Sequence, residues 1–352
     1  MLEAYCAMKS SNARTAPTLD DVAKAARVST ATVSRCINEP KMVSEPTRER
    51  VEAAIQSLGY TPNFAARFMA VKRTFTIGAI IPTMENAIFA RGVQAFQEEL
   101  NRRGYTLLVS SSAYKPNAEQ EQIRTLVARG ADGLFLIGHD RDPAAYDYLE
   151  AQGVPALVAW SYDPERRLPS VGFDNRAAMR AMTEKVIRMG HRRIAMISGI
   201  SQGNDRARAR IEGVRDAMAA HGLEPAALDP IEVPYGIAEG KAAFAQVISR
   251  TSGPSIVLCG NDVLAVGAIR GAEELGLKVP DDISITGFDD IEIAQVVSPA
   301  LTTVHVPHRD MGRFAAEELI GMIEDERAGQ SRLLETRIMD RATVKNLVET
   351  GI

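Results

Sequence analysis

Three short amphipathic segments separated by tight turns make residues 18–59 the most constrained part of this chain. Thr18 can cap the free amides of a first helix, and Asp21 completes a capping-box pattern three residues later. Ser29 is a good N-cap for a second helix over residues 30–37. A third segment follows, with an N-cap serine and an early proline, so the pattern predicts three helices around a small apolar core.

The second segment has two different faces. Val33 and Ile37 recur at the i, i+4 spacing and can pack on the first helix, whereas Thr30, Ala31 and Arg35 lie on the opposite face. In a helix-turn-helix the second helix enters the major groove, where arginine matches guanine and hydroxyls suit phosphate oxygens. Helical patterning alone also fits an ordinary three-helix bundle. The residues expected to contact DNA here are Thr18, Ser29, Thr30, Ala31, Thr32, Ser34, Arg35 and Asn38.

The run DDVAKAARVSTATVSRCIN at residues 20–38, followed by VSEPTRERVEAAIQSLGYTPN, resembles the lactose-repressor (LacI/GalR) family of bacterial transcription regulators. The resemblance continues through nearly the whole chain, with TFTIGAIIP, GHRRIAMISG and SPALTTVHVP in the family's usual order. Only about the first 16 residues fall outside it. The resemblance implies a sequence-specific repressor whose operator affinity is set by a small molecule. It also favours a DNA-binding helix-turn-helix over an ordinary three-helix bundle for residues 18–59.

The charge of the chain is unevenly distributed. Residues 1–73 carry 11 Lys and Arg against 7 Asp and Glu, a net charge of +4, whereas the whole chain has a net charge of −4. A modest basic excess predicts weak, salt-sensitive binding by a single headpiece. We therefore expect a homodimer that binds a palindromic site on double-stranded DNA.

Residues 63–73 contain helix formers but are too few for a helix that is stable alone, and a plain linker is the alternative. In the LacI/GalR family the matching hinge helix pairs with its dimer mate in the minor groove, where an apolar residue wedges a base step. The resemblance puts a methionine at that position, where leucine is usual. The hinge residues that it implies for DNA contact are Ala66, Arg67 and Met69.

Beyond Thr74, short apolar runs alternate with amphipathic helical stretches, and this rhythm restarts near residue 174. It predicts an α/β body of two doubly wound lobes behind the all-α headpiece. The resemblance adds that the lobes face each other as in periplasmic sugar-binding proteins, joined by crossing strands, one near residues 301–306. The expected divisions are a disordered tail (1–17), the headpiece (18–62), the hinge (63–73), a first lobe (about 74–174 and 304–331) and a second lobe (about 175–303 and 332–352).

The loops that follow the strands are where ligands bind in open α/β sheets. The resemblance implies effector contacts for Asp289 and Arg210 in particular; a turn or helix cap is the alternative for Asp289, a solvated helix face for Arg206 and a core position for Trp160. Aromatic and hydrogen-bonding groups together favour a sugar or sugar acid, and purine is less favoured. The candidate effector-binding residues are Ile88, Phe89, Trp160, Ser161, Asn204, Arg206, Arg210, Tyr235, Asn261 and Asp289.

Other classes of protein fit the sequence poorly. The segment YGIAEGKAA lacks the first glycine and the Ser/Thr of a phosphate loop, and no G-x-G-x-x-G occurs, so we expect no enzyme and no cofactor. Three widely spaced cysteines and five scattered histidines predict no disulfide and no metal site. A transport binding protein would share the two-lobed body, but the chain has a headpiece and lacks a signal peptide and a membrane-spanning segment, so a cytoplasmic location is expected.

Overall fold

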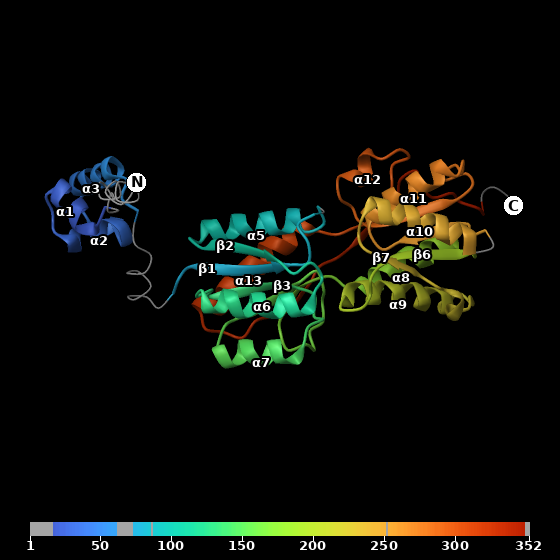
Figure 1. Ribbon diagram of the computed structural model, residues 1–352, viewed down its shortest axis with the longest axis horizontal. Coiled ribbons are helices and arrows are strands. Elements are labelled where there is room, and N and C mark those ends of the chain that lie inside the picture. Colours follow the sequence, from blue (N-terminus) through green and yellow to red (C-terminus); the bar gives the residue numbers. More distant parts are fainter. Residues whose placement is uncertain (1–16, 62–72, 86, 251–252, 349–352) are drawn as a thin grey trace, which may run out of the picture. The chain divides into compact units, whose positions relative to one another are not determined.

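A computed structural model gives the arrangement of the chain and describes residues 17–61, 73–85, 87–250 and 253–348 (Figure 1). The chain divides at Thr74 into two compact units, a headpiece and a body, and each is described by itself. The tail expected over residues 1–17 lies outside the described residues except for Pro17. The expected hinge residues Ala66, Arg67 and Met69 lie outside them as well.

Hydrogen bonds at the helix ends and a small apolar core stabilise the three helices of the headpiece. The Thr18 hydroxyl accepts a hydrogen bond from the Asp21 amide at 3.3 Å, and the Asp21 carboxylate accepts one from the Thr18 amide at 2.8 Å. The predicted capping box is therefore present, and it fixes where the first helix begins. Val22, Val33 and Val51 are completely buried between the helices. These helices are α1 (Leu19–Ala26), α2 (Thr30–Asn38), the 3₁₀ turn η1 (Pro40–Met42) and α3 (Glu45–Leu58).

The first lobe of the body is a parallel sheet with helices on both faces (Figure 1). Ile77 and Phe135 pack on one face toward α5 and α13, whereas Ile80 and Leu134 pack on the other toward α6 and α7. The strands read as continuous apolar runs because both of their faces are covered. In sheet order the strands are β11 (Arg332–Leu333), β5 (Ser170–Gly172), β4 (Ala156–Ala159), β3 (Gly133–Ile137), β1 (Thr76–Ile81) and β2 (Thr106–Ser111). The helices are α5 (Ala90–Arg102), α6 (Pro116–Ala128), α7 (Pro143–Gln152) and α13 (His308–Glu324).

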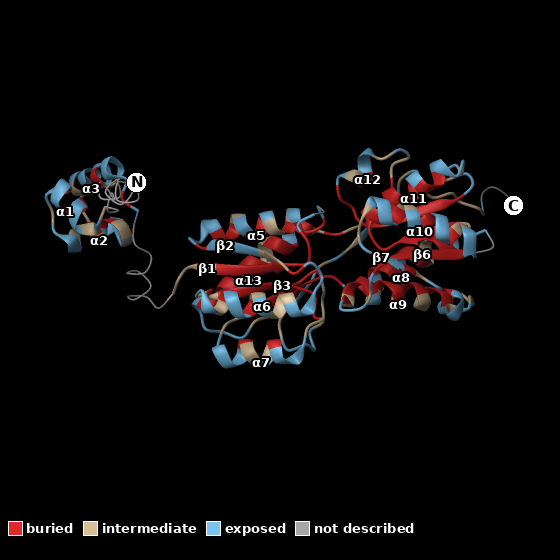
Figure 2. Ribbon diagram, viewed as in Figure 1, coloured by how far each residue is buried: buried red, intermediate tan, exposed pale blue. Residues whose placement is uncertain are grey.

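The second lobe repeats this arrangement except that its edge strand β12 runs antiparallel to β10. Figure 2 shows its strands buried between helices whose outer faces are exposed. Helices α8 and α9 cover one face of the sheet, and α10 and α11 cover the other. In sheet order the strands are β12 (Arg337–Met339), β10 (Thr302–His305), β9 (Ser284–Asp289), β8 (Ile256–Cys259), β6 (Ile194–Gly199) and β7 (Ile231–Val233). The helices are α8 (Asn175–Arg188), α9 (Asp205–Ala220), η2 (Pro225–Ala227), α10 (Ile237–Arg250), α11 (Asp262–Glu274) and α12 (Ile293–Val296).

The chain crosses between the lobes at three places, and two of them differ from the expected divisions. Strand β10 pairs with β9 as far as His305, so residues 304–305 belong to the second lobe rather than the first. Strand β11 pairs with β5, so residues 332–333 belong to the first lobe rather than the second. The crossings thus follow β5, β10 and β11. Strand pairing, which is a long-range property, sets these limits.

Candidate functional site

Helix α2 of the headpiece presents one polar face. Thr30, Ala31 and Arg35 are exposed, whereas Val33 and Cys36 are buried in the headpiece core. The expected separation of the two faces is therefore present. A helix with small side chains at its start and an arginine one turn later can lie close to a groove and reach a base edge.

The hydroxyls expected to meet phosphates are already engaged in capping. The Ser29 hydroxyl accepts the Thr32 amide at 3.2 Å and lies 2.9 Å from the Thr32 hydroxyl, while the Thr18 hydroxyl donates to Asp21 at 2.7 Å. A capping hydroxyl still has lone pairs and can turn toward solvent, because Ser29 and Thr18 are both exposed. Ser34 is half-buried on the same helix. For these residues DNA contact remains a prediction.

In the body, backbone strain gathers at the ends of the strands. Among the residues that the structure describes, eight other than glycine have positive φ, and five of them lie at the last residue of a strand or within three residues after it. The other three lie elsewhere in the chain. Such strain persists where the surroundings impose it and is frequent at binding sites. The five are Ala113 (φ 50°), Tyr114 (57°), Trp160 (60°), Asp289 (106°) and Asp290 (54°).

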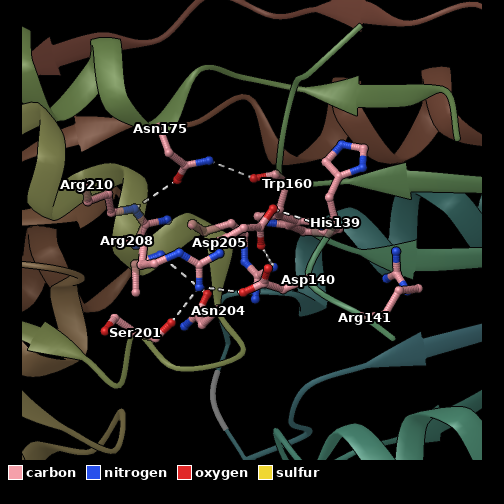
Figure 3. A network of polar contacts seen from close by, with 12 residues as sticks. His139, Asp140, Arg141, Trp160, Asn175, Ser201, Asn204, Asp205, Arg208 and Arg210 are labelled. Carbon is pink, nitrogen blue, oxygen red and sulfur yellow. Dashed lines mark hydrogen bonds and ion pairs between the residues drawn. The ribbon is translucent and has the colours of Figure 1, made fainter. Parts of the chain in front are cut away.

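A buried arginine holds the centre of this region together. Arg210 donates from Nε to Asn175 Oδ1 at 2.9 Å and from Nη1 to the Gly260 carbonyl at 2.6 Å, and its Nη2 lies 3.9 Å from Asp289 Oδ1. Asn175 Nδ2 in turn donates to the Trp160 carbonyl of the first lobe at 2.9 Å (Figure 3). Arg210 on α9 therefore connects the ends of β8 and β9 with the chain that crosses from the first lobe.

Asp289 beside this arginine is completely buried. Neither of its carboxylate oxygens accepts a hydrogen bond from any residue within the described parts of the chain. The alternative of a helix or turn cap is therefore wrong for this side chain. Burial raises the pKa of Asp289 to about 7, although the Arg210 and Arg206 guanidinium groups lower it. A buried carboxylate with free lone pairs beside a cation is suited to accept hydrogen bonds from a polar ligand.

Contacts between the lobes flank the same region. The His139 amide, after β3, donates to Asp205 Oδ2 at 2.8 Å, and Arg208 Nη1 lies 2.5 Å from Asp140 Oδ2 (Figure 3). Asp205 also pairs with Arg206 at 2.9 Å. Burial lowers the pKa of His139 to about 4, so its ring is neutral at pH 7. The N-terminal end of α9 is thus tied to the loop that follows β3.

A cavity of about 530 Å³ opens between the lobes beside these groups. The rings of Tyr114 and Tyr235 approach each other across it, with centroids 5.9 Å apart. Asn204 Nδ2 donates to the Tyr235 hydroxyl at 3.4 Å, while its Oδ1 caps α9. The lining residues are Thr83, Met84, Glu85, Ser111, Ala113, Tyr114, Ile200, Gln202, Asn204, Pro234 and Tyr235.

The structure separates the ten candidate effector residues into four groups. Asn204 and Tyr235 line the cavity, and Arg206, which is buried and lines the crevice beside it, does not lie on a solvated helix face. Arg210, Asn261 and Asp289 lie buried at the ends of β8 and β9, where Asn261 caps α11. Ser161 follows β4, with its hydroxyl on Asp205.

The aromatic and aliphatic candidates of the first lobe lie in its core. Ile88 and Phe89 are buried, and the Trp160 ring packs edge-on against Phe89 at 5.1 Å and near His308 at 6.0 Å. Trp160 is only 1% exposed, which agrees with its core alternative. Its indole Nε1 has no hydrogen-bond partner among the described residues. Effector contact by these three residues remains a prediction.

Sequence reasoning missed several residues that the fold brings to the cleft. Tyr114 and Met84 follow β2 and β1, so the rule that ligands bind beyond strand ends could have found them. His139, Asp140 and Asp205 form their contacts across the lobes, and no local pattern in the sequence indicates such partners.

Metal sites, reactive thiols and membrane-spanning helices each require features that the described residues do not show. They include no group of three or more His, Cys, Asp or Glu side chains placed to hold a metal ion. Cys36 and Cys259 are buried free thiols, and burial raises the pKa of both. No helix within the described ranges is long and apolar enough to cross a bilayer.

Each of the two units of the chain matches a known protein family. Residues 18–63 match the model for bacterial regulatory proteins of the lacI family, and residues 183–344 match that for a periplasmic binding protein-like domain. The HTH-type transcriptional repressor CytR of Escherichia coli (strain K12) is 32% identical and aligns with 97% of this chain and 100% of its own.

Two solved structures agree with these matches. The lac repressor dimer bound to operator and the anti-inducer ONPF superposes with a TM-score of 0.84 at 28% identity, covering 94% of this chain and 100% of that one. The complex of the regulator CelR with cellobiose has a TM-score of 0.69 at 30% identity, covering 93% of this chain and 99% of that one. The chain therefore belongs to the LacI family of bacterial transcriptional regulators.

Proposed function

We propose that this regulator is a repressor whose affinity for its operator is set by a sugar or sugar acid bound between the lobes of the body. The observation that carries the proposal is Asp289, a buried carboxylate without a hydrogen-bond donor among the described residues, held beside Arg210. Sugar hydroxyls would donate to the carboxylate. Acceptor oxygens of the ligand would meet the arginine and amide donors that gather there.

Control by such a ligand requires two arrangements of the lobes that bind it with different affinity. His139 with Asp205, and Asp140 with Arg208, join the lobes beside the cavity, so their contacts depend on how far the cleft is closed. A ligand held by groups of both lobes would favour the closed arrangement. In the proposed mechanism, closure of the cleft changes the spacing of the two headpieces of a dimer. The spacing in turn decides how well the two headpieces fit the two halves of the operator.

The types of group in the cleft support a sugar or sugar acid as the effector. Tyrosine rings can lie against the apolar faces of a pyranose, and Asn204, Arg206 and Asp289 can meet its edges. The CelR relative, solved with cellobiose, supports a sugar for this chain as well. Purine is less favoured, because relatives that bind purines stack the base between aromatics and Ile88 occupies one of the matching positions. No part of the mechanism calls for catalysis, a cofactor or a metal, and a repressor acts in the cytoplasm, where the operator lies.

A ligand screen tests the effector class. A ligand that binds only the folded cleft must raise the melting temperature of the purified full-length protein. Sugars and sugar acids are expected to produce the shift, and the same compounds should then change operator binding. Shifts confined to purines or to phosphorylated compounds would contradict the assignment of the cleft while leaving DNA binding untouched.

A homodimer is the second part of the proposal, and the open edge of the first sheet supports it. Strand β2 pairs with β1 alone among the described strands, and its Leu108 and Val109 are about two-fifths exposed, at 40% and 41%. An apolar edge strand is a ready surface for pairing with a second copy. The dimer would provide two headpieces for the two halves of a palindromic operator.

Charging this edge is expected to weaken the dimer. In a Leu108→Lys, Val109→Lys double variant two ammonium groups on each copy would have to be buried and would repel each other, so the fraction of monomer should rise. Analytical ultracentrifugation measures that fraction, and operator affinity should fall with it. Leu275→Lys, at a residue of the second lobe that is 51% exposed, is the matched control. A double variant as dimeric as the control would exclude this edge from the interface.

A further inference from the structure

The cavity between the lobes has an apolar mouth. Met84 is 60% exposed, Ile200 47% and Tyr114 38%, and all three line the cavity together with Tyr235. Met84 and Tyr114 come from the first lobe, whereas Ile200 and Tyr235 come from the second. A single exposed apolar side chain is ordinary, but several from two lobes around one cavity indicate that an apolar surface binds there.

The other end of the same site is polar. Tyr114 lines both the apolar cavity and a smaller crevice formed with Asp140 and Arg206. The charges of Arg210 and Asp289 also act on the Tyr114 hydroxyl. The site is therefore polar near the buried pair of Arg210 and Asp289 and becomes apolar toward its mouth. Tyr114 lies at the boundary between the polar and the apolar part.

The size of the cavity matches a ligand with two such parts. At about 530 Å³ it falls in the range of pockets that enclose a complete drug-sized molecule. A lone sugar, whose edges carry hydroxyls all around, would satisfy the polar end but would leave Met84 and Ile200 in water. A ring-sized apolar substituent on the sugar would cover them.

Resting on the proposed function, we propose that the effector is a sugar linked to a ring-sized apolar group. The sugar lies at the polar end near Asp289 and Arg210, and the apolar group lies at the mouth against Met84, Ile200 and the two tyrosines. Two sources share this chemistry, namely aryl glycosides and nucleosides. In both, a glycosidic linkage joins a hydroxylated ring to a flat aromatic ring.

Calorimetric titration of the full-length protein with matched ligands tests this inference. For glucose, galactose, xylose and ribose we would compare the methyl glycoside with the phenyl glycoside, and for ribose also cytidine and uridine. The best ligand with an aromatic ring is expected to bind about tenfold more tightly than its methyl counterpart, since partial burial of such a ring is worth roughly that factor. The phenyl and nucleoside arms tell the two sources apart.

Three outcomes would contradict the inference in different ways. If a methyl glycoside bound as tightly as the aromatic ligands, the apolar group would be refuted while the proposed sugar effector stood. If sugar acids bound and no neutral glycoside did, the effector class would stand and the apolar group would again be refuted. If no sugar derivative bound at all, the proposed function itself would fail together with the inference.

Substitutions at the mouth provide an independent readout. Met84→Ser with Ile200→Ser is expected to bring the ratio of phenyl to methyl affinity down toward one, because the apolar group then loses its contacts. Leu275→Ser replaces an equally exposed apolar residue that does not line the cavity and should leave the ratio as in the parent protein. An unchanged ratio in the double variant would overturn the assignment of the mouth.

Discussion

Replacing Arg210 with alanine is expected to lower the free energy of unfolding of the body by about 3–5 kcal/mol and to abolish the response to effector. The guanidinium group donates to Asn175 and to the Gly260 carbonyl, lies against the Phe288 ring at 4.0 Å and faces Asp289. Its removal leaves buried acceptors without a donor and takes away one of the two guanidinium groups that act on a buried carboxylate. A buried polar group left without its partner keeps its full desolvation penalty, which is larger than the net stabilisation that the same interaction gives.

Arg208→Ala is the matched control for this experiment. Arg208 lies two residues earlier on α9 and pairs with Asp140, but its side chain is 47% exposed, so the loss is expected to stay within about 1 kcal/mol. The chain has one tryptophan, Trp160, which is buried in the first lobe, so its fluorescence in a urea titration follows the unfolding of the body. Equal destabilisation by the two variants would contradict the central role of Arg210.

Arg35→Ala is expected to weaken binding to the specific operator by about 1–3 kcal/mol for each headpiece, hence about 2–6 kcal/mol for a dimer. Arg35 is exposed on the polar face of α2, one turn after the small residues that allow close approach. If it contacts a guanine edge, its loss should also relax the choice of base at one position in each half-site. Binding to a library of operators with single substitutions measures both effects.

Arg48→Ala separates base reading from general attraction to phosphates. Arg48 lies on α3 and pairs with Glu45 at 2.8 Å, so its loss removes the same charge from the headpiece at another place. This variant should bind every sequence less tightly by a similar factor and leave the preferred bases unchanged. An Arg35 variant that behaved in the same way would not be a base-reading variant.

The parts of the fold that could be predicted from the sequence are those set by local interactions. The caps at Thr18 and Ser29, the two faces of α2 and the alternation of strands and helices all depend on residues within a few positions of one another. The family and the fold class are confirmed by the comparisons with known proteins. The resemblance also drew attention to Arg210 and Asp289, which the fold brings together.

What could not be predicted depends on pairing over long distances in the sequence. His139 meets Asp205 across 66 positions. Two of the three crossings between the lobes lie about two residues beyond their expected places, because β10 and β11 are assigned by their partner strands. The position of Trp160 could not be predicted from the sequence either, because an aromatic residue after a strand can contact a ligand or pack in a core. The packing of Phe89 and His308 around its ring places Trp160 in the core of the first lobe, and effector contact by Trp160 stays a prediction.

The most direct test of the account is the affinity of the full-length protein for its operator, measured with and without a saturating concentration of a sugar ligand found by thermal shift. The account predicts a change of about 5- to 150-fold, the usual range of coupling between two sites. In the Asp289→Asn variant, which loses the carboxylate that we propose receives the ligand, the change should disappear. Equal operator affinity in the presence and absence of a bound ligand would contradict allosteric control by the cleft.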